Sequence, residues 1–202
     1  MFPVAAALLA LMPAALWLLL FWSRDRDDPE PIGLILGLVA AGALVAVPAA
    51  LVVNTGLGLV IGPVVTLLAG FTEEPIKTAV ARWRARASRA FDEPLDGMIF
   101  GTSVALGFAA AETTLYLVGF VIPLAESAAE AGLTQDAYAL GVLAPLRGLF
   151  SALGHALWTG IAGYFLAQHL LAGAGIWRLA AGVALAATLH SAYNTFAEVA
   201  AA

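Results

Sequence analysis

Six long apolar stretches, separated by short polar segments, constrain the fold of this 202-residue chain more than any other feature. A membrane-spanning helix needs about 20 consecutive apolar residues to cross a hydrocarbon core of roughly 30 Å. The stretches of this kind are Phe2–Trp22, Ile32–Val53, Leu57–Val80, Gly97–Ile122, Leu140–Leu171 and Trp177–Val199. They predict an all-α, polytopic membrane helix bundle of about six transmembrane helices, forming a single membrane domain over residues 1–202.

The composition supports this prediction. Hydrophobic residues make up 62% of the chain and charged residues 11%, against about 45–50% and about 25% in soluble domains. A soluble domain of this size could not bury so much apolar surface. The chain has no cysteine, which excludes disulfides and thiolate-bound metals.

The basic residues indicate how the chain is oriented. The first, third and fifth loops carry arginines, whereas the second and fourth carry no Lys or Arg: Arg24, Arg26, Arg82, Arg84, Arg86, Arg89 and Arg178. Positively charged loops face the cytoplasm, so both termini are expected outside. Arg147, within the fifth stretch, is the exception. The basic run Arg82–Arg89 fits contact with anionic lipid headgroups, so the expected partner is the lipid bilayer and not nucleic acid.

Turn residues predict where the helices break. Asn54–Gly56 is expected to separate the second and third stretches. A further break is expected at Gly70–Pro75, because proline removes a backbone donor and favours a helix start. A helix beginning near Thr72 would hold Glu73 and Glu74 in its first turn, where the helix dipole favours negative charge.

Ionisable residues inside the stretches point to a function. Each costs about 2.5–3.5 kcal/mol near the centre of a membrane helix, so such residues usually mark a site. The first two stretches, within residues 1–53, have none and are expected to be scaffold helices. Residues 57–199 form a four-helix core that carries all of them, together with one asparagine: Glu73, Glu74, Lys77, Glu112, Arg147, His155, His190 and Asn194.

Spacing predicts which of these residues meet. Glu73 and Lys77 are four residues apart and can pair on one helix face, and His190 and Asn194 have the same spacing. At 1.5 Å per residue, straight helices leave Glu112 too far outward to reach Glu74. Taken singly, these groups could also form a structural ion pair or a packing histidine. As a set they predict a polar cavity.

The residue types indicate hydrolysis. The chain has no nucleophile elbow, phosphate-binding loop or H-E-x-x-H helix. Carboxylates and histidines suit water activation by a glutamate, and they also suit a divalent metal such as zinc, held by His and Glu. The alternatives are a proton-coupled transporter, which also uses buried Glu and His, and a catalytically inactive membrane scaffold. Against the transporter, the two halves of the chain show no matching broken helices.

Four segments in order carry a resemblance to a known family. They are Glu73-Glu-Pro-Ile-Lys77, Asp92–Gly97 leading to Gly107–Glu112, Gly154–Gly160, and Leu189–Asn194. The first is similar to the E-E-x-x-K motif of the PrsW family of membrane proteases, and the others follow in the expected order from about Phe71 to Phe196. That family is related to the CAAX-protease and bacteriocin-processing superfamily.

The resemblance implies an intramembrane endopeptidase of the bacterial cytoplasmic membrane. Its substrate would be a membrane-anchored protein, as in the regulated proteolysis of an anti-sigma factor. The resemblance makes Glu73, Glu74, His155 and His190 the catalytic residues, with Glu74 as the expected base. Lys77, Glu112 and Asn194 are implied as supporting residues, and Glu112, His155 and His190 as the ligands of any metal. Thr113 departs from the family, because many relatives have asparagine there.

Overall fold

The computed structural model describes the backbone of residues 2–23 and 28–201, and the side chains of residues 11–23, 28–133 and 148–199. Arg24, Arg26 and the side chain of Arg147 lie outside this part. Every regular element within it is helical, which confirms the all-α prediction. The α-helices are α1 (Phe2–Trp22), α2 (Ile32–Ala41), α3 (Val47–Ile61), α4 (Val64–Leu67), α5 (Ala69–Arg86), α6 (Pro94–Tyr116), α7 (Ile122–Glu130), α8 (Thr134–Leu170) and α9 (Ile176–Ala201).

Two π-helical turns join consecutive helices without ending them. Gly42–Ala46 links α2 to α3, and Leu117–Val121 links α6 to α7. Each turn is followed by a proline, Pro48 or Pro123, at the start of the next helix. Proline cannot donate to the carbonyl four residues earlier, and the wider π turn lets the helix continue past this gap. In each case two helices thereby continue as one long helical segment, Ile32–Ile61 and Pro94–Glu130.

The expected break at Asn54–Gly56 is wrong. The α3 helix continues through these residues to Ile61 and ends at Gly62, which has a φ of 63°. The next residue is Pro63. Positive φ is readily adopted by glycine, and proline after a helix prevents its continuation. The segment Leu57–Val80 is therefore divided among α3, α4 and α5 and is not a single helix.

Three helical segments are long and apolar enough to cross a membrane within the described part of the chain. They are Ile32–Ile61, Pro94–Glu130 and Gly148–Leu170, with a shorter apolar helix at Leu11–Trp22. The α5 and α9 helices are not among them, because ionisable and amide side chains lower their hydropathy. The structure thus supports a membrane protein, and the count of six spans stays a prediction.

Glycines allow the central helices to pack backbone to backbone. A Cβ atom added to Gly97 on α6 would lie 2.2 Å from the carbonyl oxygen of Gly163 on α8. A Cβ atom on Gly107 would lie 1.9 Å from the carbonyl oxygen of Val39 on α2. Small residues permit such close approach in membrane bundles. These contacts hold α2, α6 and α8 together around the polar residues.

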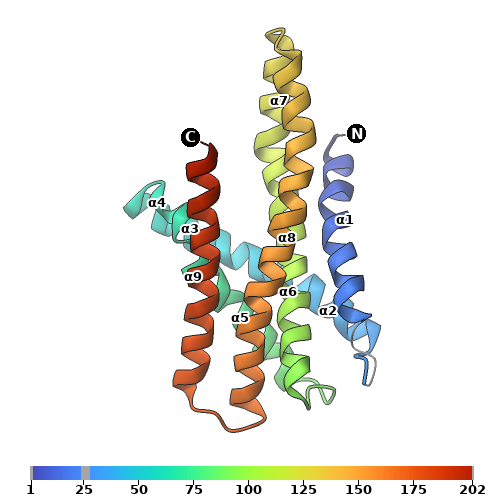
Figure 1. Ribbon diagram of the computed structural model, residues 1–202, viewed down its shortest axis with the longest axis vertical. Coiled ribbons are helices and arrows are strands. Elements are labelled where there is room, and N and C mark those ends of the chain that lie inside the picture. Colours follow the sequence, from blue (N-terminus) through green and yellow to red (C-terminus); the bar gives the residue numbers. More distant parts are fainter. Residues whose placement is uncertain (1, 24–27, 202) are drawn as a thin grey trace.

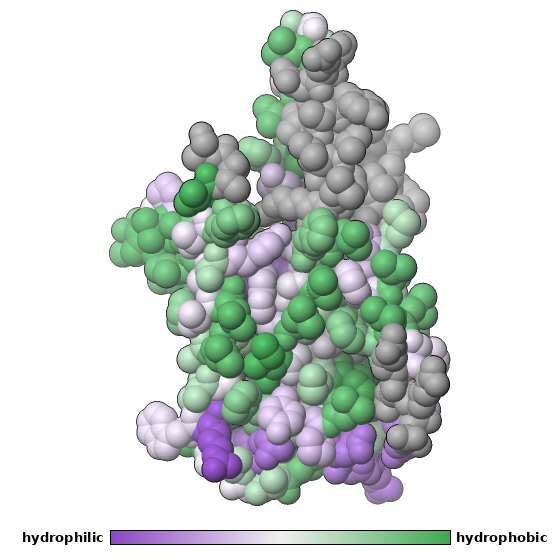
Figure 2. Space-filling model, viewed as in Figure 1, coloured by the Kyte–Doolittle hydropathy of each residue, from purple (hydrophilic) through white to green (hydrophobic). Residues whose placement is uncertain are grey.

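The arginine-bearing turns after α5 and before α9 lie at one end of the molecule. In Figure 1 the α5–α6 and α8–α9 connections are at the lower end, while the first turn of α1 and the last turn of α9 lie in the upper part, below the α7–α8 tip. Hydrophilic residues gather at this lower end of the visible face, beneath a mostly hydrophobic flank (Figure 2). This arrangement agrees with the alternation of charge along the sequence.

Candidate active site

The α5 helix supplies the two adjacent carboxylates and the lysine of the site. It begins at Ala69 and continues through Pro75 without ending. Glu73 and Glu74 therefore lie in its second turn, and the prediction of a new helix that places both in its first turn is wrong. Glu74 and Lys77 are both fully buried, with no exposed surface. Buried charges in proteins are paired, so the partners of these groups define the site.

Glu74 is the centre of a hydrogen-bond network that joins three helices. Its Oε1 accepts from Lys77 Nζ at 2.5 Å and from His190 Nδ1 at 3.0 Å. Its Oε2 accepts from Thr159 Oγ1 at 2.8 Å. Both carboxylate oxygens are thus occupied, and α5, α8 and α9 are fixed to one another through a single side chain.

Glu73 has a different environment. Its Oε1 accepts a hydrogen bond from Asn54 Nδ2 at 3.3 Å. Its Oε2 is buried and has no hydrogen-bond partner among the described residues. Lys77 Nζ and His190 Nε2 each lie 3.9 Å from it. One oxygen of Glu73 therefore remains available for a water molecule or a metal ion.

His155 connects Lys77 to Glu112. Its Nδ1 lies 2.9 Å from Lys77 Nζ, and its Nε2 lies 3.1 Å from Glu112 Oε2. An ammonium group can only donate, so Nδ1 accepts and Nε2 carries the hydrogen that Glu112 accepts. The Glu112 side chain is 42% exposed, which makes it the open edge of an otherwise buried network.

The structure brings Glu112 into the site through His155, and among the described residues no hydrogen bond or ion pair joins Glu112 directly to Glu74, as expected for straight helices. The α6 helix begins at Pro94, three residues before the predicted start at Gly97. The imidazole of His155 then spans the remaining distance to Lys77.

His190 is oriented by Glu74. Because a carboxylate only accepts, His190 Nδ1 donates to Glu74 and the lone pair of Nε2 faces Glu73. The ring of Trp158 stacks on the imidazole with centroids 4.4 Å apart and an interplanar angle of 16°. The aromatic packing and the hydrogen bond together fix the direction in which Nε2 points.

Sequence reasoning missed three residues and misplaced one. Thr159 and Trp158 lie within the segment Gly154–Gly160, and Thr159 is four residues from His155, so spacing could have revealed it. Asn54 was expected to form a turn. Asn194 makes no hydrogen bond to His190 in the described residues. It is half-buried and donates to the carbonyl of Thr66 at 3.1 Å, which ties α9 to α4.

Comparison with known proteins decides the family. The sequence profile described as "PrsW family intramembrane metalloprotease" matches residues 30–202. The chain belongs to the PrsW family. The match includes every polar residue of the site.

Individual PrsW relatives are about one third identical to this chain over part of its length. The chain is 32% identical to protease PrsW of Bacillus subtilis (strain 168) over 125 residues, which cover 59% of this chain and 56% of the relative. It is 33% identical to protease PrsW of Geobacillus kaustophilus (strain HTA426) over 110 residues, or 52% and 49% of the two chains. The chain spans about half the length of these relatives. No solved structure gives a significant match.

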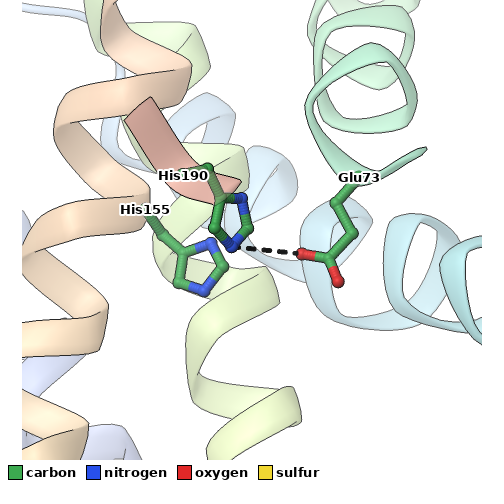
Figure 3. A group of neighbouring side chains, drawn as sticks. All are labelled: Glu73, His155 and His190. Atoms are coloured by element: carbon green, nitrogen blue, oxygen red, sulfur yellow. Dashed lines mark ion pairs between the residues drawn. The ribbon is translucent and has the colours of Figure 1, made fainter. Parts of the chain in front are cut away.

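The description of the PrsW family implies a metal, and the residues of this site fit one. Glu73, His155 and His190 each offer one ligand atom, and these atoms lie within 4.8 Å of one another. Figure 3 shows their side chains, from α5, α8 and α9, directed toward one another. Two histidines and a glutamate are a common donor set for catalytic zinc, and the unpartnered Glu73 Oε2 is free to bind.

The geometry alters the predicted ligand set. Glu73 completes the group in the structure, where the sequence had suggested Glu112 beside the two histidines. Glu112 instead accepts from His155. Carboxylates of this kind commonly orient a ligating histidine. Both nitrogens of His155 have partners, so His155 would bind a metal only by releasing Lys77 or Glu112.

Proposed function

We propose that this chain is a membrane-embedded endopeptidase that hydrolyses a peptide bond in a membrane-anchored protein. The observation that carries the proposal is the buried cluster of Glu73, Glu74, Lys77, His155 and His190, in which one oxygen of Glu73 has no hydrogen-bond partner among the described residues. Membership of the PrsW family supports peptide-bond hydrolysis as the reaction.

Glu73, rather than Glu74, is the group we assign to water activation. Glu74 uses both oxygens to hold Lys77, His190 and Thr159. Glu73 Oε2 is free to take a proton from water. The water oxygen then bonds to the scissile carbonyl carbon. As the C–N bond breaks, the proton passes from Glu73 to the departing amine.

The remaining residues hold and polarise the reactants. The ammonium of Lys77 supplies fixed positive charge, which stabilises negative charge on the scissile carbonyl oxygen. His190 keeps its Nε2 lone pair toward Glu73 because Glu74 holds its Nδ1. Where a divalent metal such as zinc is required, Glu73, His155 and His190 would hold it, and the metal would supply Lewis-acid chemistry and a more acidic water in place of base catalysis by the free Glu73 oxygen.

The proposal also includes the membrane, the topology and the substrate of the protein. The protein is placed in the bacterial cytoplasmic membrane with six spans, the arginine-bearing turns in the cytoplasm and both termini outside. Its substrate would be a single-span protein, with a membrane-anchored anti-sigma factor as the example given by the family resemblance. The superfamily relation to CAAX proteases is part of the same expectation.

Cleavage of a panel of single-span reporter proteins tests the proposal. We expect wild type to cut at least one reporter, and Glu73→Gln and His190→Ala to cut none. Glu126→Gln is the matched control, because Glu126 is an exposed carboxylate outside the cluster. Equal cleavage by Glu73→Gln would overturn the site. Purified protein treated with a chelator should lose activity and regain it with zinc if the metal is required.

A further inference from the structure

The α3 helix, which carries no charged residue, directs one polar side chain toward the cluster. Among its fifteen residues only Asn54 and Thr55 have polar side chains. From Leu51 to Ile61, Asn54 and Gly58 are half-buried and every other residue is exposed. Asn54 is therefore the polar side chain that this otherwise apolar segment turns toward the neighbouring helices.

The Asn54 amide lies between Thr72 and Glu73 on α5. Its Nδ2 donates to Glu73 Oε1 at 3.3 Å, and its Oδ1 accepts from Thr72 Oγ1 at 2.6 Å. A carboxylate can only accept, so the amide nitrogen must face Glu73 and the amide oxygen must face the Thr72 hydroxyl. This hydroxyl is itself held against α5, since Thr72 Oγ1 also lies 2.8 Å from the carbonyl oxygen of Ala69. The amide is thus fixed in one orientation from both ends.

Lys77 competes with Asn54 for the Glu73 carboxylate. The ammonium has three hydrogens, and it is within hydrogen-bond distance of Glu74 and of the His155 ring. Glu73 Oε2 lies 3.9 Å from Lys77 Nζ, about 1 Å beyond a usual hydrogen-bond distance. A glutamate and a lysine with this spacing on a helix pair readily. Without a second contact, Glu73 would close the gap and its free oxygen would be occupied.

Building on the proposed function, we propose that Asn54 is a positioning residue: it holds Glu73 by Oε1 and thereby keeps Oε2 from pairing with Lys77. Thr72 acts through Asn54, because it fixes the orientation of the amide. The α3 helix is then a part of the active site and not a scaffold alone. If Asn54 only joined α3 to α5, its loss would change the stability of the protein and not its catalytic rate.

Steady-state cleavage of one reporter by purified protein tests the positioning role. We expect Asn54→Ala to lower kcat about 10- to 100-fold, as loss of a group that orients a reacting side chain does. KM should stay near its wild-type value, because Asn54 contacts Glu73 and not the substrate. Thr72→Val should also lower kcat, and Thr72→Ser should restore most of it. Thr55→Val is the matched control, because it removes a hydroxyl from an exposed residue of α3.

The double variant tests whether Thr72 acts through Asn54. In the Asn54→Ala protein, Thr72→Val should lower kcat no further, because its effect depends on the amide that is already missing. A wild-type kcat in Asn54→Ala, or losses that multiply in the double variant, would overturn the proposal.

An exchange of the two functional groups tests the contact without cleavage. Asn54→Asp places a second carboxylate against Glu73 and should lower the thermal unfolding temperature in detergent by at least about 2 °C. Adding Glu73→Gln should restore this temperature, because the amide and the carboxylate have then exchanged places and can bond again. A double variant as unstable as Asn54→Asp alone would overturn the contact. Wild-type protein that cuts no reporter would refute the proposed function, and the exchange would still decide whether Asn54 holds Glu73.

Discussion

At the residue scale, the two adjacent carboxylates have different environments. Glu74 accepts three hydrogen bonds, whereas Glu73 accepts one and keeps Oε2 without a partner in the described part of the chain. Sequence alone treats them as a pair, because both are acidic and both lie in the same motif. Only the contacts made by α8 and α9 distinguish them.

This difference separates the expected effects of two matched substitutions. Glu73→Gln should reduce cleavage at least about 100-fold, because it removes the water-activating group, and should leave the thermal unfolding temperature in detergent nearly unchanged. Glu74→Gln, unlike Glu73→Gln, should destabilise the fold by about 3 kcal/mol, because it leaves Lys77 buried without its closest anion. Similar unfolding temperatures for both variants would contradict the assignment of Glu74 as the structural centre.

Thr159 provides a second test at this scale. Thr159→Val keeps the shape but removes the hydroxyl that donates to Glu74 Oε2. We expect a loss of about 1–3 kcal/mol in unfolding free energy, since a buried carboxylate oxygen loses its donor, while Thr159→Ser should restore most of it. Thermal unfolding of the three proteins measures the difference. Equal unfolding free energies of Thr159→Val and Thr159→Ser would show that this hydrogen bond does not stabilise the fold.

The sequence could predict the charged members of the cluster but not the neutral ones. Glu73, Glu74, Lys77, His155 and His190 stand out because charge is costly in an apolar helix. Neutral side chains such as Thr159 and Asn54 cost less free energy in an apolar helix than charged ones do. Their role therefore depends on which helix packs against them. The spacing placed Asn194 on the same helix face as His190, but only the packing of α4 shows that its amide donates to the carbonyl of Thr66.

At the element scale, helix boundaries are set by a few backbone features. Gly62 and Pro63 end α3, while Asn54–Gly56 continues it. The sequence predicted the wrong break because asparagine and glycine favour turns in isolation, whereas here Asn54 donates to Glu73 across the helix interface. A tertiary contact outweighs the local preference.

Two glycine substitutions test these assignments. Gly97→Ala places a methyl group 2.2 Å from the carbonyl oxygen of Gly163, so α6 and α8 must separate, and we expect a loss of about 1–3 kcal/mol. Gly56→Ala has nothing within 4 Å and lies inside α3, so it should be neutral or stabilising by up to about 1 kcal/mol. Thermal unfolding compares them. A destabilising Gly56→Ala would support a turn at this position instead.

At the scale of the whole molecule, charge and topology agree. The arginine-bearing turns after α5 and before α9 lie together at one end, away from the first turn of α1 and the last turn of α9 (Figure 1). Apolar length and charge alternation were sufficient to predict a helical membrane bundle. The number of spans could not be settled in this way, because α5 and α9 carry the polar site and lose hydropathy for that reason.

The absence of cysteine makes the orientation directly measurable. Single cysteines at Ala87, in the turn after α5, and at Ser127, on α7, are both exposed. With a membrane-impermeant maleimide added to intact spheroplasts, we expect labelling at Ser127→Cys and not at Ala87→Cys, and the reverse in inverted vesicles. Labelling of both positions from the same side would refute the proposed topology.

The most direct test of the central claim uses purified protein in liposomes with one cleaved reporter, in heavy-oxygen water. We expect wild type to yield two fragments, with one heavy oxygen atom in the new C-terminal carboxylate as hydrolysis requires, and Glu73→Gln to yield none. Fragments produced equally by Glu73→Gln, or no fragments from wild type with any reporter cut in cells, would contradict the claim that this buried cluster is a peptidase active site.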